Sequence, residues 1–97
     1  MPTVTLTRPS ATLEEIAAGL REQLGDRYQV APKGGSTDVL RVSAGTMALA
    51  SVRVVRAAGV TTCRVHGGGL IIGRLINELS IARTVAAALR KAPGVGA

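Results

Sequence analysis

Aromatic residues are almost missing from the sequence: Tyr28 is the only one, and there is no Trp or Phe. Since hydrophobic residues nevertheless make up 46% of the 97 residues, the core is expected to consist of Val, Leu, Ile and Ala side chains. Proteins that bind single-stranded RNA on a sheet stack its bases on exposed aromatic residues. Because the one tyrosine is expected to point inward, sequence-specific recognition of single strands on this sheet is disfavoured.

Cysteine and histidine are equally scarce, with Cys63 and His66 the only examples. They form no internal disulfide and leave a zinc site short of ligands, so no metal or other cofactor is expected. The two residues are three apart in a strand, which sends their side chains to opposite faces and removes a Cys–His catalytic pair. This cysteine usage is typical of a reducing cytoplasm, and the N-terminal MPTVTLTRP shows no signal peptide.

Catalytic and nucleotide-binding motifs are also missing. The segment HGGG at 66–69 is similar to the oxyanion-hole segment of esterases, but the chain has no G-x-S-x-G nucleophile elbow. The glycines at 67, 68, 69 and 73 match neither the dinucleotide-binding nor the P-loop spacing. We therefore expect a protein that is not an enzyme. The longest apolar region, 69–89, is not expected to span a membrane because it contains Arg74, Asn77, Glu78 and Arg83.

Two helices are predicted, one on each side of a central strand-rich region. Thr12 and Glu15 have the spacing of a capping box, apolar residues then recur every three or four positions, and Gly25 supplies a stop, which predicts a helix over 13–24. A second apolar stripe predicts a helix over about 69–91, and its residues are Ile72, Leu75, Ile76, Leu79, Ala82, Ala86 and Leu89. Ile71, Ile81, Val85 and Ala88 lie off this stripe, so the helix is expected to be buried on more than one side. Residues 3–7, TVTLT, alternate as a strand does and form either a short extra N-terminal strand at the sheet edge or a loose arm.

Between the helices the hydrophobic period changes to two, in the runs RYQVAP, TDVLRVS, MALASVRVV and VTTCRVH. Their short links favour an antiparallel meander over parallel crossovers. The predicted fold is α+β: a four-stranded antiparallel meander with an N-terminal and a C-terminal helix packed on one face, in the order α-β-β-β-β-α. The predicted division is an arm or edge strand over 1–11, a single domain over 12–92 and a flexible tail over 93–97.

Alternation along the strands assigns each residue to the helix-covered face or to the open face. The residues predicted to point inward are Tyr28, Val30, Leu40, Val42, Ala48, Ala50, Val52, Val54, Cys63 and Val65. The open face receives Arg27, Gln29, Arg41, Ser43, Leu49, Ser51, Arg53, Thr62, Arg64 and His66. Links of three residues at 44–46 and four at 56–59 predict that Arg41 lies opposite Leu49, Arg53 opposite Thr62 and Ser51 opposite Arg64.

Positive charge is concentrated beyond the first helix. The net charge is +6, yet residues 1–26 hold two basic and four acidic residues, and residues 27–97 hold ten basic and two acidic ones. Arg41, Arg53, Arg64 and His66 are predicted to share one patch of the open face without a carboxylate, which suits phosphate oxygens or an acidic protein surface. A merely solvated face is the alternative, since open antiparallel sheets normally expose polar residues. The same side also carries apolar residues that would suit a dimer interface, namely Val39, Leu49, Val55 and Val60.

The start of the second predicted helix is another candidate anion site. It has no Ser, Thr, Asp or Asn cap, so its first amides lack a side-chain acceptor, and His66 and Arg74 lie nearby in the sequence. Water or the glycine backbone would satisfy these amides equally well.

The order helix–strands–helix resembles that of double-stranded RNA-binding domains. Those domains have three strands and a lysine cluster at the start of their second helix, where this chain has GGGLIIGR. We expect instead a small non-enzymatic binding or accessory domain that presents a basic sheet face to an acidic protein or a polyanion. The residues expected to carry the binding are Arg41, Arg53, Arg64, His66 and Arg74. Two alternatives stay open: nonspecific nucleic-acid binding through the arginines, and homo-oligomerisation.

Overall fold

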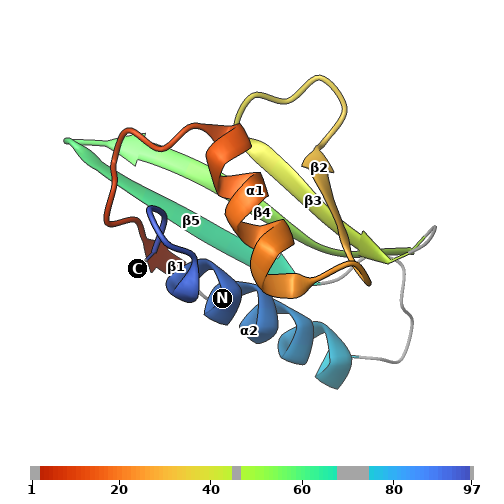
Figure 1. Ribbon diagram of the computed structural model, residues 1–97. Helices are drawn as coiled ribbons and strands as arrows, with labels where there is room; N and C mark the ends of the chain where they lie inside the picture. Colours follow the sequence, from red (N-terminus) through yellow and green to blue (C-terminus); the bar gives the residue numbers. More distant parts are fainter. Residues whose placement is uncertain (1–2, 45–46, 68–74, 97) are drawn as a thin grey trace.

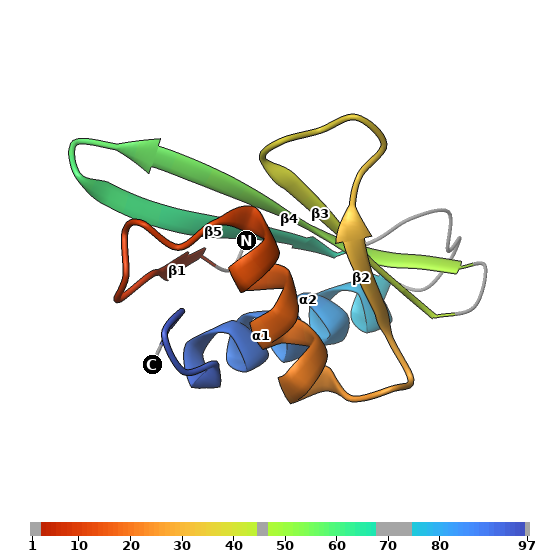
Figure 2. The same ribbon diagram turned by 45° about the horizontal axis from the view of Figure 1, so that its top comes forward.

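In the residues that the structure describes, the fold consists of one antiparallel sheet and two helices. The computed structural model describes residues 3–44, 47–67 and 75–96, with 47–49 and 75–81 described by their backbone alone. The elements in chain order are β1 (Thr3–Thr5), α1 (Leu13–Leu24), β2 (Gln29–Pro32), β3 (Val39–Ala44), β4 (Met47–Ala57), β5 (Val60–Gly67) and α2 (Leu75–Lys91). The strand order is β1-β5-β4-β3-β2, and both helices lie on the same side of the sheet (Figures 1 and 2). The predicted α+β fold, with its meander and terminal helices, is confirmed.

The N-terminal segment forms an edge strand rather than a loose arm. β1 pairs antiparallel with β5, with Val4 opposite Cys63. Val4 and the following Leu6 are buried at 3% and 4% exposure and belong to the core cluster. Their burial holds the short strand against the sheet, because three residues of pairing alone would be marginal in water.

The register of the sheet differs from the predicted one because both hairpin links are shorter than expected. Ala58 and Gly59 alone join β4 to β5, with φ angles of 53° and 77° as a type I′ turn requires. The pairing of β3 with β4 reaches Ala44 and Met47, and its register shifts between Val42 and Ser43. The predicted pairs are therefore wrong, and the observed ones are Arg41–Ser51, Arg53–Arg64 and Ser51–His66.

Helix α1 begins and ends where its local sequence predicts. The Thr12 hydroxyl accepts a hydrogen bond from the Glu15 amide at 3.1 Å, and the Thr12 amide donates to Glu15 Oε1 at 3.0 Å. Hydrogen bonds from the backbone and side chain of Thr12, together with the charge of Arg8, hold the pKa of the Glu15 carboxyl below its usual value. Arg21 in the last turn donates from Nε and Nη2 to the Val30 carbonyl at 3.0 and 2.7 Å, which ties the helix to β2.

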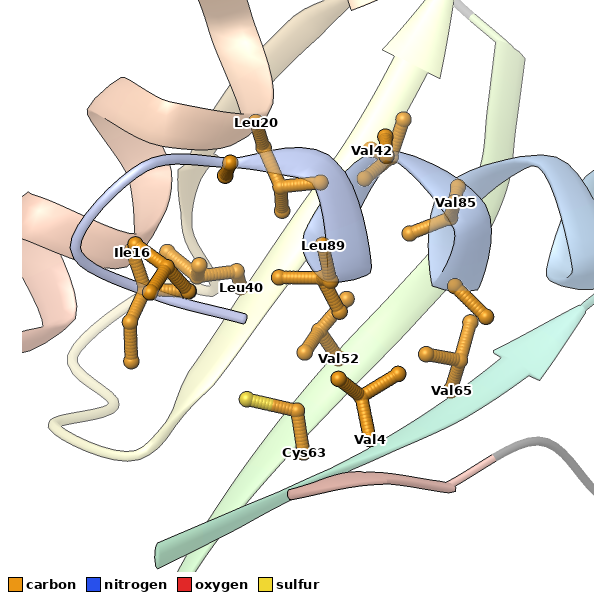
Figure 3. Close-up of a cluster of buried hydrophobic side chains, with 14 of the residues drawn as sticks. Val4, Ile16, Leu20, Leu40, Val42, Val52, Cys63, Val65, Val85 and Leu89 are labelled. Carbon is orange, nitrogen blue, oxygen red and sulfur yellow. The ribbon is translucent and has the colours of Figure 1, made fainter. Parts of the chain in front are cut away.

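Helix α2 packs against both the sheet and α1, and it is buried on two sides. Ala82, Ala86 and Leu89 follow the predicted apolar stripe, while Val85 and Ala88, which lie off that stripe, are buried as well. Figure 3 shows this aliphatic core, in which side chains of α1, α2 and the strands meet. The predicted helix residues 69–74 lie outside the described part of the chain. Within that part, neither helix combines the length and apolarity needed to cross a membrane.

Residues 92–96, most of which the sequence assigns to a flexible tail, turn back onto the fold. Val95 is 2% exposed and belongs to the core cluster. Its carbonyl accepts hydrogen bonds from the Thr7 amide at 2.7 Å and from Thr7 Oγ1 at 3.0 Å. The segment after β1, at Thr7, and the segment after α2, at Val95, therefore lie side by side.

Candidate functional site

The face of the sheet turned away from the helices carries the candidate site. Alternation along each strand assigns the faces correctly although both links differ from the prediction. The β4–β5 link is shorter by two residues, which keeps the inward and outward positions paired with their own kind. The β3–β4 link is shorter by one residue, and the register shift between Val42 and Ser43 compensates for it. The predicted inward residues with described side chains are buried, apart from a half-buried Tyr28. The predicted outward residues with described side chains are exposed or half-buried, except Val39, which is buried at 8% exposure. Ala48 and Leu49 lie among the side chains that the structure does not describe.

Four predicted site residues come together on three adjacent strands. Arg53 on β4 lies directly opposite Arg64 on β5, and Arg41 on β3 and His66 on β5 flank Ser51 in the next row. Arg41, Arg53 and Arg64 are exposed, and His66 is half-buried. We call this surface, Arg41, Arg53, Arg64 and His66 around Ser51, the arginine face. The true register groups these residues more tightly than the predicted one.

The arginine face holds an unfavourable pair of like charges. Directly opposite residues place their Cβ atoms about 5 Å apart, where like charges destabilise a sheet by up to about 1 kcal/mol. Among the described residues, no carboxylate occupies an outward position on these strands. The ion pairs found in the described part of the chain, Arg8–Glu15 and Arg21–Glu14, both involve α1. The positive charge of the arginine face is therefore available to an external anion.

Hydroxyl side chains surround the arginines. Ser51 lies between Arg41 and His66, Thr3 on β1 lies opposite Arg64, and Thr5 lies opposite Thr62. The face thus offers guanidinium and hydroxyl donors on four neighbouring strands.

Arg56 is a residue that sequence reasoning missed, because the segment RAAG was interpreted as a hairpin link. Its Nη1 donates to the Pro9 carbonyl at 2.9 Å and its Nη2 to the Ala11 carbonyl at 2.6 Å. Thr61, directly opposite on β5 and 2% exposed, donates from its hydroxyl to the same Pro9 carbonyl at 2.7 Å. Arg56 comes two residues after the inward-pointing Val54 on β4, so strand alternation places its side chain on the helix-covered side. This alternation distinguishes Arg56 from the arginines of the open face. It binds the chain's own N-terminal segment.

Cys63 belongs to the core and not to the site. Its side chain is 0% exposed on the helix-covered side, whereas His66 shares the outward parity of Arg64. Burial raises the pKa of the Cys63 thiol to about 11, against a lowering effect of the Arg56 charge. A thiol held in its neutral form is a poor nucleophile. Across the described residues, no group of three or more His, Cys, Asp or Glu side chains is arranged to hold a metal ion.

The raised pKa of Cys63 predicts a loss of stability at alkaline pH. In the unfolded chain the thiol ionises near 9.0, so between pH 9 and 11 the unfolded state releases a proton that the folded state retains. The stabilising contribution is complete below pH 9 and is lost as the pH rises towards 11, at up to about 1.4 kcal/mol per pH unit. Urea denaturation of the native protein and of Cys63→Ala at pH 8, 9, 10 and 11 measures this. The variant should show the shallower decline, and equal slopes would contradict the prediction.

The second candidate anion site, at the start of the predicted C-terminal helix, falls on residues 68–74. Arg74 and the amides of that segment lie outside the described residues.

Comparison of the chain with protein-family models, with curated proteins and with solved structures finds no match. The function is therefore argued from the geometry of the arginine face alone.

Proposed function

We propose that this protein is a small non-enzymatic binding domain whose arginine face holds an anionic macromolecule, either an acidic protein or a polyanion. The observation that carries the proposal is the direct opposition of Arg53 and Arg64, with Arg41 and His66 beside them and no outward carboxylate among the described residues of these strands. A bound anion between the guanidinium groups would replace their repulsion by attraction. The free Cys63 thiol is in keeping with a cytoplasmic location, which is part of the proposal.

The chemistry of arginine supports an oxoanion as the bound group. Each guanidinium presents a planar fork of N–H donors that matches two oxygens of a phosphate or carboxylate. Three such groups on adjacent strands present their donors on one surface. The net charge of +6 adds long-range attraction that accelerates encounter with a polyanion and weakens as salt increases.

Self-association through the same face is the less favoured alternative. A two-fold contact brings the same patch of both copies together, so the arginines of one copy would meet those of the other without an opposite charge. Size-exclusion chromatography with light scattering tests this alternative, and a monomer at micromolar concentration would remove it.

Charge reversal separates specific binding by the arginine face from an effect of net charge. We expect Arg53→Glu with Arg64→Glu to weaken binding of heparin, used as the polyanion probe, by at least tenfold at low salt. The matched control is Arg83→Glu with Arg90→Glu, which changes the net charge equally at exposed positions of α2, on the other side of the sheet. The control should bind within threefold of the native protein. Isothermal titration calorimetry gives the affinities, and NMR of the arginine Nε–H groups locates the contact.

Two results would overturn this proposal. Equal losses in the two double variants would mean that only the net charge matters. Absence of NMR shifts at Arg41, Arg53 and Arg64 with heparin would mean that the arginines are simply solvated.

A further inference from the structure

The hydrogen-bond donors of the arginine face suit the phosphate groups of a nucleic acid better than the surface of an acidic protein. We propose that the anionic partner is a nucleic-acid duplex, bound through its phosphate groups without readout of the bases. This inference rests on the proposed function and names its partner. Arginine and hydroxyl side chains are among the groups that contact phosphate and sugar oxygens in protein–DNA complexes. Both kinds lie together here, with Thr3 opposite Arg64, and Ser51 between Arg41 and His66.

The residues of this face disfavour a single strand. Binding of single-stranded nucleic acid depends on aromatic side chains that stack on successive bases. Tyr28 is the only aromatic residue of the chain, and it packs against the core on the helix-covered side.

An acidic protein is also a poorer fit to this face. Protein interfaces obtain much of their affinity from aromatic and apolar residues that are buried at the centre of the contact. Among the described side chains, the one large hydrophobic residue that is exposed is Val60, at 46%, and it lies at the tip of the β4–β5 hairpin. Beside the arginines, Val39 opposite Arg53 is buried and Val55 is half-buried, so neither projects as an anchor. Phosphate binding needs charge and hydrogen-bond donors without such anchors.

The shape of the sheet fits a duplex as well. The pairing of β3 with β4 stops at Val39 and Arg53, whereas β4 and β5 remain paired as far as Ala57 and Val60. The hairpin therefore projects beyond the end of β3 (Figure 2). Residues 6–11 lie against its helix-covered side at Arg56 and Thr61, and residues 57–60 at its tip are exposed. The DNA major groove is wide enough to admit a two-stranded β-ribbon, and the exposed tip is the part of this hairpin that can enter it. The tip residues Ala57, Ala58 and Gly59 offer no side-chain donor or acceptor to the bases, so contact there would not depend on sequence.

Fluorescence anisotropy with labelled 20-base-pair DNA of two unrelated sequences tests the inference. Three arginine–phosphate contacts predict a slope of about −2.7 for log affinity against log salt. Affinity should then fall about fortyfold between 50 and 200 mM salt, equally for both sequences. Arg41→Ala, Arg53→Ala and Arg64→Ala should each reduce the slope by about 0.9. Arg83→Ala, on α2, should leave it unchanged.

Parallel titrations with the single strand, with poly-glutamate and with heparin distinguish the possible failures. Duplex binding at least tenfold tighter than single-strand binding supports the inference, and equal or tighter binding of the single strand overturns it. Binding of poly-glutamate or heparin at the arginine face without binding of the duplex also overturns it, but leaves the proposed function standing. If none of the four probes binds, both proposals fail.

Discussion

Replacing Leu89 with alanine is expected to lower the free energy of unfolding by about 3 to 5 kcal/mol. Leu89 is 0% exposed and lies among Leu20 of α1, Leu40 and Val52 of the sheet (Figure 3). Alanine would leave a cavity between three elements that also pack on other residues, so the site cannot collapse easily. A domain of this size is stable by about 5 to 15 kcal/mol, which makes the loss a large part of the total.

Urea denaturation followed by circular dichroism measures this effect. The control is Leu89→Met, which keeps the volume and should cost less than about 1.5 kcal/mol. A loss below about 1 kcal/mol for Leu89→Ala would contradict the tight packing of Leu89 between α1, α2 and the sheet.

Replacing Arg56 with methionine is expected to lower the free energy of unfolding by about 2 kcal/mol and to leave binding by the arginine face intact. Methionine keeps an unbranched apolar stem but removes the donors to the Pro9 and Ala11 carbonyls. Ala11 is 0% exposed, and an unpaired buried carbonyl costs about 1 to 3 kcal/mol. The Pro9 carbonyl keeps its hydrogen bond from Thr61, and part of the Arg56 side chain is exposed, which moderates the loss.

The same denaturation experiment and the heparin titration together test the role of Arg56. Arg83→Met, at an exposed position of α2, is the matched control and should change stability by less than about 0.5 kcal/mol. Under conditions where it is folded, Arg56→Met should bind heparin within threefold of this control. A tenfold loss of binding would place Arg56 in the binding surface instead.

These two variants and the charge reversals divide the basic residues by what they contact. Arg56 and Arg21 donate to backbone carbonyls of the chain itself, and Arg8 pairs with Glu15. Arg41, Arg53 and Arg64 instead lie on a face where the described outward positions carry no carboxylate. A net charge of +6 alone does not distinguish these roles, whereas the contacts do.

The sequence by itself determined what depends on near neighbours in the chain. The capping box of α1 joins residues three apart, and it was predicted with its partners. The alternation of the strands determined which residues face the helices, so the arginines were placed on the open face correctly. The side-chain period of a strand is two, so a register change of two residues between β4 and β5 left the faces unchanged, and between β3 and β4 the shift at Val42 and Ser43 compensated for a link that is one residue shorter.

Only the tertiary structure decided which residues meet across the sheet and between the ends of the chain. The two-residue turn at Ala58 and Gly59 brought Arg53 opposite Arg64, a pair that the predicted register had separated. The hydrogen bonds of Arg56 to Pro9 and of Thr7 to Val95 join residues 47 and 88 positions apart. No local period encodes such contacts, because they depend on how the strands and helices pack once the core has excluded water.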